Sequence, residues 1–155
     1  MLGRWTVSLA ALAAASLTVG PAAADPDFDN RQDFDFAQRG FVATRADPKI
    51  VAADGHVVWD LTAYDFLKGP APATANASLW RQGQLLSKAG LFKVTDGVWQ
   101  VRGFDIANAT FIQGKTGWIV IDTLTSAEAA KADYDLVSEK LGKRPVAPSR
   151  GCSSR

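Results

Sequence analysis

The sequence has almost none of the residues from which metal sites and disulfides are most often built. Its 155 residues include one histidine, His56, and one cysteine, Cys152. A single cysteine excludes an intramolecular disulfide. A single imidazole cannot build a histidine-rich zinc cluster, because zinc sites use three or four protein ligands. We therefore predict no catalytic, cofactor-binding or metal-binding residues in this chain.

A strong charge of either sign is also lacking. Seventeen lysines and arginines stand against sixteen aspartates and glutamates, which gives a formal net charge of +1. Proteins that bind nucleic acids or acidic membrane surfaces usually carry clustered positive charge. We therefore expect neither nucleic acid nor a membrane surface as a partner.

Residues 1–24 have the order of a secretory signal peptide. Arg4 supplies a positive charge, residues 5–19 are apolar, and Ala22, Ala23 and Ala24 form a small-residue cleavage site. The apolar run is shorter than the roughly 20 residues of a membrane-spanning helix. This order predicts export to the periplasm or the extracellular space, with cleavage after Ala24 and no remaining membrane anchor.

A leader and a ribbon are predicted next. Residues 25–38 alternate aspartate with phenylalanine without a regular period, which indicates an exposed coil. Two short β-prone runs flank Asp54 and Gly55, and this pair favours a tight hairpin turn. A two-stranded ribbon is therefore expected over residues 49–60.

The segment that follows the ribbon predicts a helix over residues 78–89. Its leucines fall near one helical face. Either Asn76 or Ser78 can cap its start, and Gly90 can end it.

Residues 91–142 have the pattern strand, turn, strand, turn, strand and helix. Apolar runs predict strands at 98–101, 108–113 and 118–121, and residues 114–116 are expected to be a turn. The last run is apolar at every position, which favours coverage of both of its faces in the finished fold.

A helix is predicted to begin at Thr125, which forms a capping box with Glu128. Gly142 and Pro145 are expected to end it. A crossover helix of this kind normally leads into a second, parallel strand. The apolar stripe expected to lie on the sheet consists of Ala127, Ala130, Tyr134, Val137 and Leu141.

The expected second strand is interrupted after Val146. Residues 147–155 contain a proline and several small polar or charged residues, which cannot form a central strand. With one allowed choice of codons, residues 147–154 read one nucleotide out of phase become apolar and β-branched, so a frameshifted tail is a hypothesis. A stop codon directly after codon 155, with no homologous downstream frame, would contradict it.

Five segments together resemble the linear alkyl sulfatases of the metallo-β-lactamase superfamily. They are DGHVVWD (54–60), SLWRQ (78–82), GLF (90–92), DGVWQVRG (96–103) and GWIVID (117–122). The resemblance covers about residues 38–146. It implies an α/β (α+β) fold: a ribbon and a helix over residues 39–90, then an incomplete metallo-β-lactamase domain over 91–146. That domain would supply the first sheet strands and the crossover helix of an αββα sandwich.

In that family, exported dimeric enzymes hydrolyse alkyl sulfate esters such as dodecyl sulfate with two zinc ions. The strand after the crossover helix leads into a His-x-His-x-Asp-His loop, and zinc lowers the pKa of a bound water to roughly 7. This loop is absent from the sequence, so the resemblance implies an inactive N-terminal portion. For Asp122 it implies hydrogen-bonded support around the metal loop of the parent fold. The alternative is a loop aspartate that bonds nearby backbone N–H groups.

The remaining candidate residues are assigned ordinary structural roles. We expect His56 to face solvent at the hairpin tip. The pairs Asp33/Asp35 and Asp133/Asp135 are predicted to be solvated carboxylates without a catalytic role. The tryptophans predicted to pack, rather than to form an alkyl-chain surface, are Trp59, Trp80, Trp99 and Trp118.

Two other functions remain open from the sequence. One is a small periplasmic binding or interaction protein that self-associates through an exposed sheet edge. The other is a fragment of a different hydrolase with the metallo-β-lactamase fold.

Overall fold

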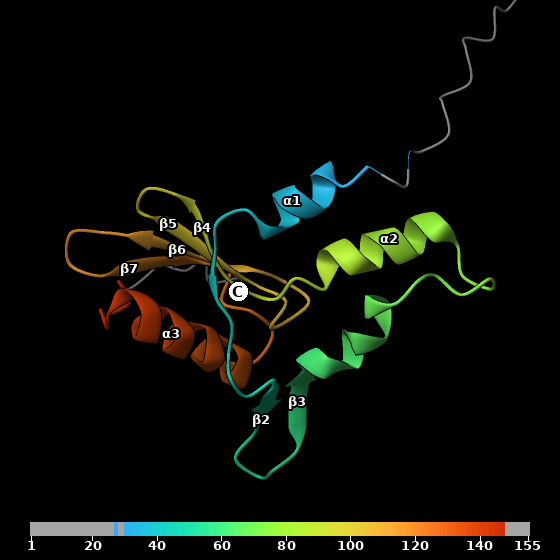
Figure 1. Ribbon diagram of the computed structural model, residues 1–155. Coiled ribbons are helices and arrows are strands. Elements are labelled where there is room, and N and C mark those ends of the chain that lie inside the picture. Colours follow the sequence, from blue (N-terminus) through green and yellow to red (C-terminus); the bar gives the residue numbers. More distant parts are fainter. Residues whose placement is uncertain (1–26, 28–29, 148–155) are drawn as a thin grey trace, which may run out of the picture.

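The largest element of the computed structural model is a five-stranded sheet, with α3 on one side of it (Figure 1). The structure describes residues 27 and 30–147. The predicted signal peptide and nearly all of the proposed frameshifted tail lie outside these residues. Within them, no helix has the length and apolar character needed to span a membrane.

The sheet has the strand order β1-β4-β5-β6-β7, and every neighbouring pair is antiparallel. The predicted strands and the turn at 114–116 are confirmed. The strands are β1 (Phe41–Ala43), β4 (Gly90–Thr95), β5 (Val98–Arg102), β6 (Ala109–Gln113) and β7 (Trp118–Ile121).

The predicted ribbon is confirmed as β2 (Lys49–Val51) and β3 (Val57–Asp60), which pair antiparallel. Gly55 at its tip has a φ of +90°, a conformation that glycine adopts without a steric penalty. Ile50 is buried and joins the main hydrophobic core. The ribbon is thus anchored below α3, as Figure 1 shows.

The prediction that residues 25–38 are coil is wrong for its last part, which forms α1 (Gln32–Gln38). Phe34 is buried, and the Arg31 and Arg81 guanidinium groups lie 3.9 Å and 5.1 Å from its ring centroid. Arg81 also pairs with Asp33 at 2.8 Å. Contacts with a segment far along the chain therefore stabilise this helix, and local periodicity does not reveal them.

The predicted helix before the sheet is α2 (Ala77–Leu86), and of its two candidate caps the structure selects Asn76. The Asn76 Oδ1 accepts a hydrogen bond from the Leu79 N–H at 3.1 Å. The predicted end at Gly90 is wrong, because Gly90 is already paired with Arg102 as the first residue of β4. A short 3-10 helix, η1 (Leu61–Lys68), connects the ribbon to α2.

The crossover helix α3 (Ala127–Leu141) ends before Gly142, as predicted, but buries a different stripe from the one expected. Of the predicted stripe, only Val137 is fully buried. The buried face includes a carboxylate and two alanines, so hydrophobicity alone selects the wrong side of the helix. The buried side chains are Ala129, Ala132, Asp133, Leu136 and Val137.

Coverage of both faces of β7 is not found in the described part of the chain. Trp118 is 1% exposed and lies in the core, but Ile119 and Ile121 are 47% and 55% exposed. Successive side chains of a strand point to opposite faces. Since α3 covers one face only, the two isoleucines remain on the open one.

After α3 the chain begins to pair with β7 in the parallel direction. Val146 forms a parallel bridge with Trp118. The Trp118 N–H donates to the Pro145 carbonyl at 2.8 Å, and the Ala147 N–H donates to the Trp118 carbonyl at 2.7 Å. This pairing has the direction expected for a strand that follows a crossover helix.

We predict that Gly40→Ala destabilises the chain more than Gly55→Ala. Both glycines have a positive φ, +74° and +90°, but a Cβ on Gly40 would clash with the Lys93 carbonyl, whereas a Cβ on Gly55 meets no atom within 4 Å. Overpacking typically costs about 1–3 kcal/mol beyond the shared backbone strain. Chemical denaturation measures both free energies of unfolding, and equal losses would contradict the tight approach at Gly40.

Candidate functional site

The chain takes an unusual path directly after β7. Asp122 and Leu124 have φ values of +62° and +66°, in the left-handed region that residues other than glycine seldom adopt. The Asp122 Oδ1 accepts a hydrogen bond from the Leu124 N–H at 3.0 Å. This is the bonding expected of a loop aspartate. A supporting role for Asp122 around a metal loop remains a prediction.

Asp105 ties this turn to the loop between β5 and β6. Its Oδ2 accepts hydrogen bonds from the Thr125 N–H and hydroxyl, both at 2.7 Å, and its Oδ1 accepts from the Ile106 N–H at 2.5 Å. Burial alone raises the pKa of Asp105, but the hydrogen bonds from Thr125, Ile106 and Ala107 outweigh it and hold the pKa below its usual value. Asp105 is therefore ionised at neutral pH.

The bond to Asp105 also explains why the predicted capping box at Thr125 is wrong. The Thr125 hydroxyl donates to Asp105 instead of accepting from the helix. Ser126 takes its place as the cap, and its Oγ accepts from the Ala129 N–H at 3.1 Å. The cap residue is thus decided by a carboxylate twenty positions earlier in the chain.

Asp133 contradicts the prediction that it is a solvated carboxylate. It is 1% exposed, and neither of its carboxylate oxygens has a hydrogen-bond partner among the described residues. Burial raises the pKa of Asp133 to about 8, with a further increase from the negative charge of Asp105 and an opposing effect from Arg45. Asp133 is consequently protonated at neutral pH, while Asp135 is exposed and pairs with Lys131.

A cavity of about 130 Å³ lies between α3 and the end of β7, and Asp122 and Asp133 are its acidic lining residues. The resemblance implies two zinc ions in complete alkyl sulfatases. Within residues 27 and 30–147, no three histidine, cysteine, aspartate or glutamate side chains lie close enough to hold a metal. Two carboxylates without an imidazole do not fit a zinc pair.

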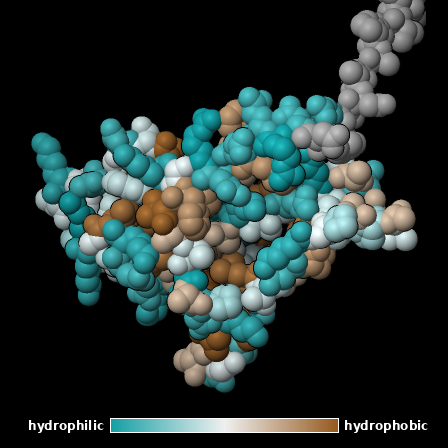
Figure 2. All heavy atoms as spheres, in the orientation of Figure 1, coloured by the Kyte–Doolittle hydropathy of each residue, from teal (hydrophilic) through white to brown (hydrophobic). Residues whose placement is uncertain are grey.

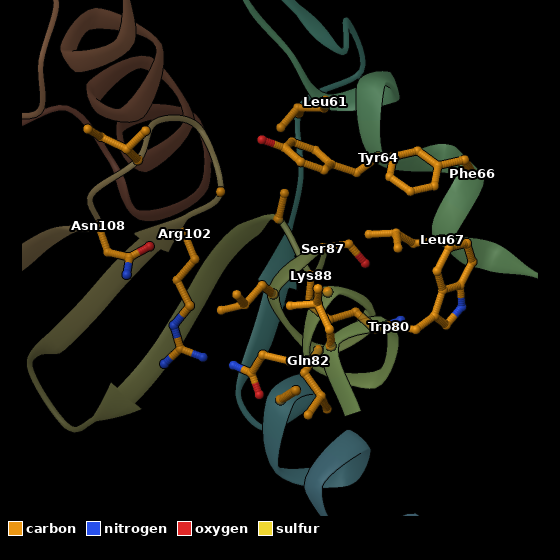
Figure 3. Close-up of a pocket in the computed structure, with 18 of the residues that line it drawn as sticks. Leu61, Tyr64, Phe66, Leu67, Trp80, Gln82, Ser87, Lys88, Arg102 and Asn108 are labelled. Carbon is orange, nitrogen blue, oxygen red and sulfur yellow. The ribbon is translucent and has the colours of Figure 1, made fainter. Parts of the chain in front are cut away.

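A second and larger cavity, of about 860 Å³, lies between η1, α2 and the loop after β5; we call it the apolar hollow (Figure 3). Tyr64, Phe66 and Trp80 lie across it from Arg102 and Asn108. Hydrophobic surface is visible on this face of the molecule between the positions of α3 and η1 (Figure 2). The volume of the apolar hollow falls within the roughly 300–1,000 Å³ of small-molecule sites.

Packing is confirmed for Trp99 and Trp118. Trp118 makes edge contacts with Trp99 and Phe111, with ring centroids 5.6 Å and 6.2 Å apart. The indole N–H groups of the half-buried Trp59 and Trp80 donate to the Gly103 and Gly69 carbonyls at 2.8 Å and 3.1 Å, respectively. These last two rings also line the apolar hollow.

The other predicted residues lie away from both cavities. His56 is exposed at the hairpin tip, as predicted, with its Nδ1 2.6 Å from the Asp54 Oδ1. Asp33 and Asp35 are both exposed, and Asp33 pairs with Arg81. Cys152 lies outside the described residues.

Sequence reasoning did not single out Asp105 or Arg102, and it placed Asp133 on the wrong face. A signal for Asp133 was present, because Ala129 and Val137 stand four residues before and after it on the same helical face. For Asp105 the only local signal is its position between Phe104 and Ile106. Its partner Thr125 could not be inferred from spacing.

We predict that Asp133→Asn stabilises the chain at pH 9 and has little effect at pH 4. Because the pKa of Asp133 rises from 3.8 to about 8 on folding, the unfolded chain loses its proton first, and stability falls as pH rises through this range. The loss of folding stability that comes from ionising the buried Asp133 is at most about 6 kcal/mol.

Denaturation at both pH values measures the effect. Asp135→Asn, on the same helix but exposed, is the control and should change stability by no more than about 0.5 kcal/mol. A gain that is equal at pH 4 and pH 9 would contradict burial of a neutral Asp133.

No family model matches the chain. It is 45% identical over 121 residues to a linear primary-alkylsulfatase of Pseudomonas sp and 46% identical over 120 residues to the alkyl/aryl-sulfatase BDS1 of Saccharomyces cerevisiae. Each match covers 77% of this chain but only 18% and 19% of the relatives, so the chain spans about a fifth of their length.

A solved structure agrees with these matches. The stereoselective inverting sec-alkylsulfatase Pisa1 from Pseudomonas sp. superposes with a TM-score of 0.72 at 48% identity, over 76% of this chain and 19% of that one. The mixed sheet-and-helix fold is thus a partial metallo-β-lactamase fold. The chain is therefore similar to one part of the alkylsulfatases, which amounts to about a fifth of their length.

Proposed function

We propose that this chain is the N-terminal portion of a zinc-dependent alkyl sulfatase and that the 155-residue polypeptide does not hydrolyse sulfate esters by itself. The observation that carries the proposal is the 45% identity to a linear primary-alkylsulfatase in a chain with a single histidine. Complete members would use two zinc ions to activate water and polarise the ester. This polypeptide has too few imidazoles to hold such a pair.

The carboxylates near the end of β7 do not supply an alternative catalyst. Asp105 already accepts three hydrogen bonds, Asp133 is protonated and enclosed, and Asp122 bonds its own turn. A general base must reach the proton that it removes, and a nucleophile needs such a base beside it. The only imidazole is at the tip of the ribbon. These positions support inactivity toward esters.

We predict no release of inorganic sulfate from dodecyl sulfate by the purified chain, with or without added zinc, because no pair of groups activates water. Ion chromatography measures sulfate, and metal analysis after dialysis measures bound zinc. A full-length alkylsulfatase is the positive control, and His56→Ala tests adventitious zinc. Turnover above the metal-free control, or zinc retained in stoichiometric amount, would contradict the proposal.

A second candidate function is favoured by the open face of the sheet. Ile119 and Ile121 on β7 are exposed side by side on the face that α3 leaves uncovered. Apolar surface of this kind favours association with another chain. If the chain acts as an interaction module, it would use this face to bind another protein or a second copy of itself. The alkylsulfatase relatives give no support to a different hydrolase of the same fold.

We predict that the chain self-associates and that Ile119→Ser with Ile121→Ser shifts it toward the monomer. Size-exclusion chromatography with light scattering measures the mass. The matched control is Val51→Ser with Val57→Ser, two β-branched residues of the ribbon with exposures of 46% and 49%. A monomer in every variant would rule out this function.

A further inference from the structure

The walls of the apolar hollow are exposed although they are apolar. Phe66 of η1 and Leu79 and Leu86 of α2 line the hollow and are 64%, 72% and 70% exposed. Tyr64 and Trp80 continue these walls (Figure 3), and the Phe66 and Trp80 rings meet edge to face with centroids 5.8 Å apart. Apolar side chains gathered around one accessible cavity mark a surface to which something apolar binds.

The sequence contains an apolar run that matches this hollow. Residues 5–19 include no charged residue, and Trp5, Leu9 and Leu12 recur at intervals of four and three, which places them on one face of a helix. The run is rich in alanine, the residue with the highest helix propensity. As a helix, these residues would span about 22 Å, compared with about 15 Å for α2.

The chain enters the described structure close to the hollow. The Asn30 carbonyl accepts a hydrogen bond from the Arg81 Nη2 at 2.8 Å, and the neighbours of Arg81 on α2, Trp80 and Gln82, line the hollow. Residues 20–29 connect the apolar run to Asn30, and a connection of this length spans at most roughly 36 Å when extended. This reach exceeds the length of α2, so the run can lie along the hollow of its own chain.

The charges of the hollow and of this connection are opposite in sign. Arg102 and Lys88 line the hollow, and neither forms an ion pair with another described residue. Asp105 also lines it, but its oxygens already accept hydrogen bonds from the backbone and from a threonine. Residues 20–29 contain three aspartates and no basic residue. Electrostatic attraction therefore favours the approach of this connection to the hollow.

Attachment to the same chain favours the apolar run over a second molecule as the occupant. A short connection holds an attached segment at an effective concentration of about millimolar, well above the micromolar concentrations at which separate chains usually meet. Ala37 of α1 also lines the hollow, so the hollow is bordered by the helix that follows the connection.

We propose that in the unprocessed chain the apolar run 5–19 docks in the apolar hollow, with Trp5, Leu9 and Leu12 against η1 and α2. Removal of the run, which the sequence predicts after Ala24, would open the hollow. The contact covers exposed apolar side chains while the run is attached and uncovers them once it is removed. This inference does not rest on the proposed function, because it needs neither a metal nor a sulfate ester.

Photo-crosslinking in the full 155-residue chain tests the contact. The photoreactive residue p-benzoylphenylalanine replaces Leu12, and mass spectrometry maps its attachment sites. Adducts within the same chain are expected on η1 (61–68) or α2 (77–86). A mixture of unlabelled and isotope-labelled chains separates adducts within one chain from adducts between two. The same replacement at Ala14, which on a helix faces away from Leu12, should give fewer adducts on these walls.

Paired substitutions in the run test which of its faces docks. With the probe at position 12, Trp5→Glu with Leu9→Glu should weaken docking about tenfold or more, because an unpaired charge is costly to bury. The matched control is Ala10→Glu with Ala14→Glu, which adds the same charge at the same spacing on the opposite face. This control should retain the adducts on η1 and α2.

A second pair of variants tests the wall of the hollow. Leu79→Glu puts a negative charge on the wall at an exposed position in the first turn of α2, where an acidic side chain favours the helix. Its control, Ser78→Glu, lies one residue earlier and outside the lining. Near-ultraviolet circular dichroism confirms that both variants keep the native fold.

The outcomes decide between the apolar run and other occupants. Adducts on η1 or α2 within one chain that are lost in Trp5→Glu with Leu9→Glu and in Leu79→Glu, but kept in both controls, support the inference. Adducts mainly between chains overturn it in favour of a second copy. No adducts on these two walls, or equal adducts in all variants, also overturn it. None of these results bears on sulfate release, so the proposed function is judged separately.

Discussion

The structure depends on the burial of one face of its sheet under α3. Leu136 and Val137 from the helix pack with Val101, Phe111 and Trp118 from the strands to form one hydrophobic core. A sheet with one covered face has a second face that must be solvated or covered by something else. Here that second face retains exposed isoleucines on β7, so the packing that stabilises the fold also leaves surface available for a further layer or partner.

Two aspartates beside this core illustrate how position decides charge. Asp105 is buried but receives three hydrogen bonds, which stabilise its ionised form. Asp133 is buried without any partner among the described residues and is neutral at pH 7. A desolvated carboxylate is expensive unless donors replace water. Asp105 therefore links two loops, whereas Asp133 makes the fold less stable as the pH rises.

The two cavities of the described residues lie in different parts of the fold. The apolar hollow, which Arg102 and Asp105 line, lies between η1, α2 and β5, whereas the strained turn after β7, Asp122 and Asp133 lie at the edge of α3. The chain shares 45–48% identity with alkylsulfatases over about three quarters of its length.

The sequence by itself determined the strands of the meander, the ribbon at Asp54 and Gly55, the end of α3 and the alkylsulfatase relationship, because these follow from local periodicity, turn chemistry and contiguous motifs. Only the tertiary structure decided that residues 32–38 are helical, that Ser126 rather than Thr125 caps α3, and that Asp133 is buried. Each of these depends on a partner distant in sequence: Arg81 for Phe34, Asp105 for Thr125 and the sheet for Asp133. Such pairings arise from packing between distant segments, and only for Asp133 did the sequence offer a local signal, in Ala129 and Val137 on the same helical face.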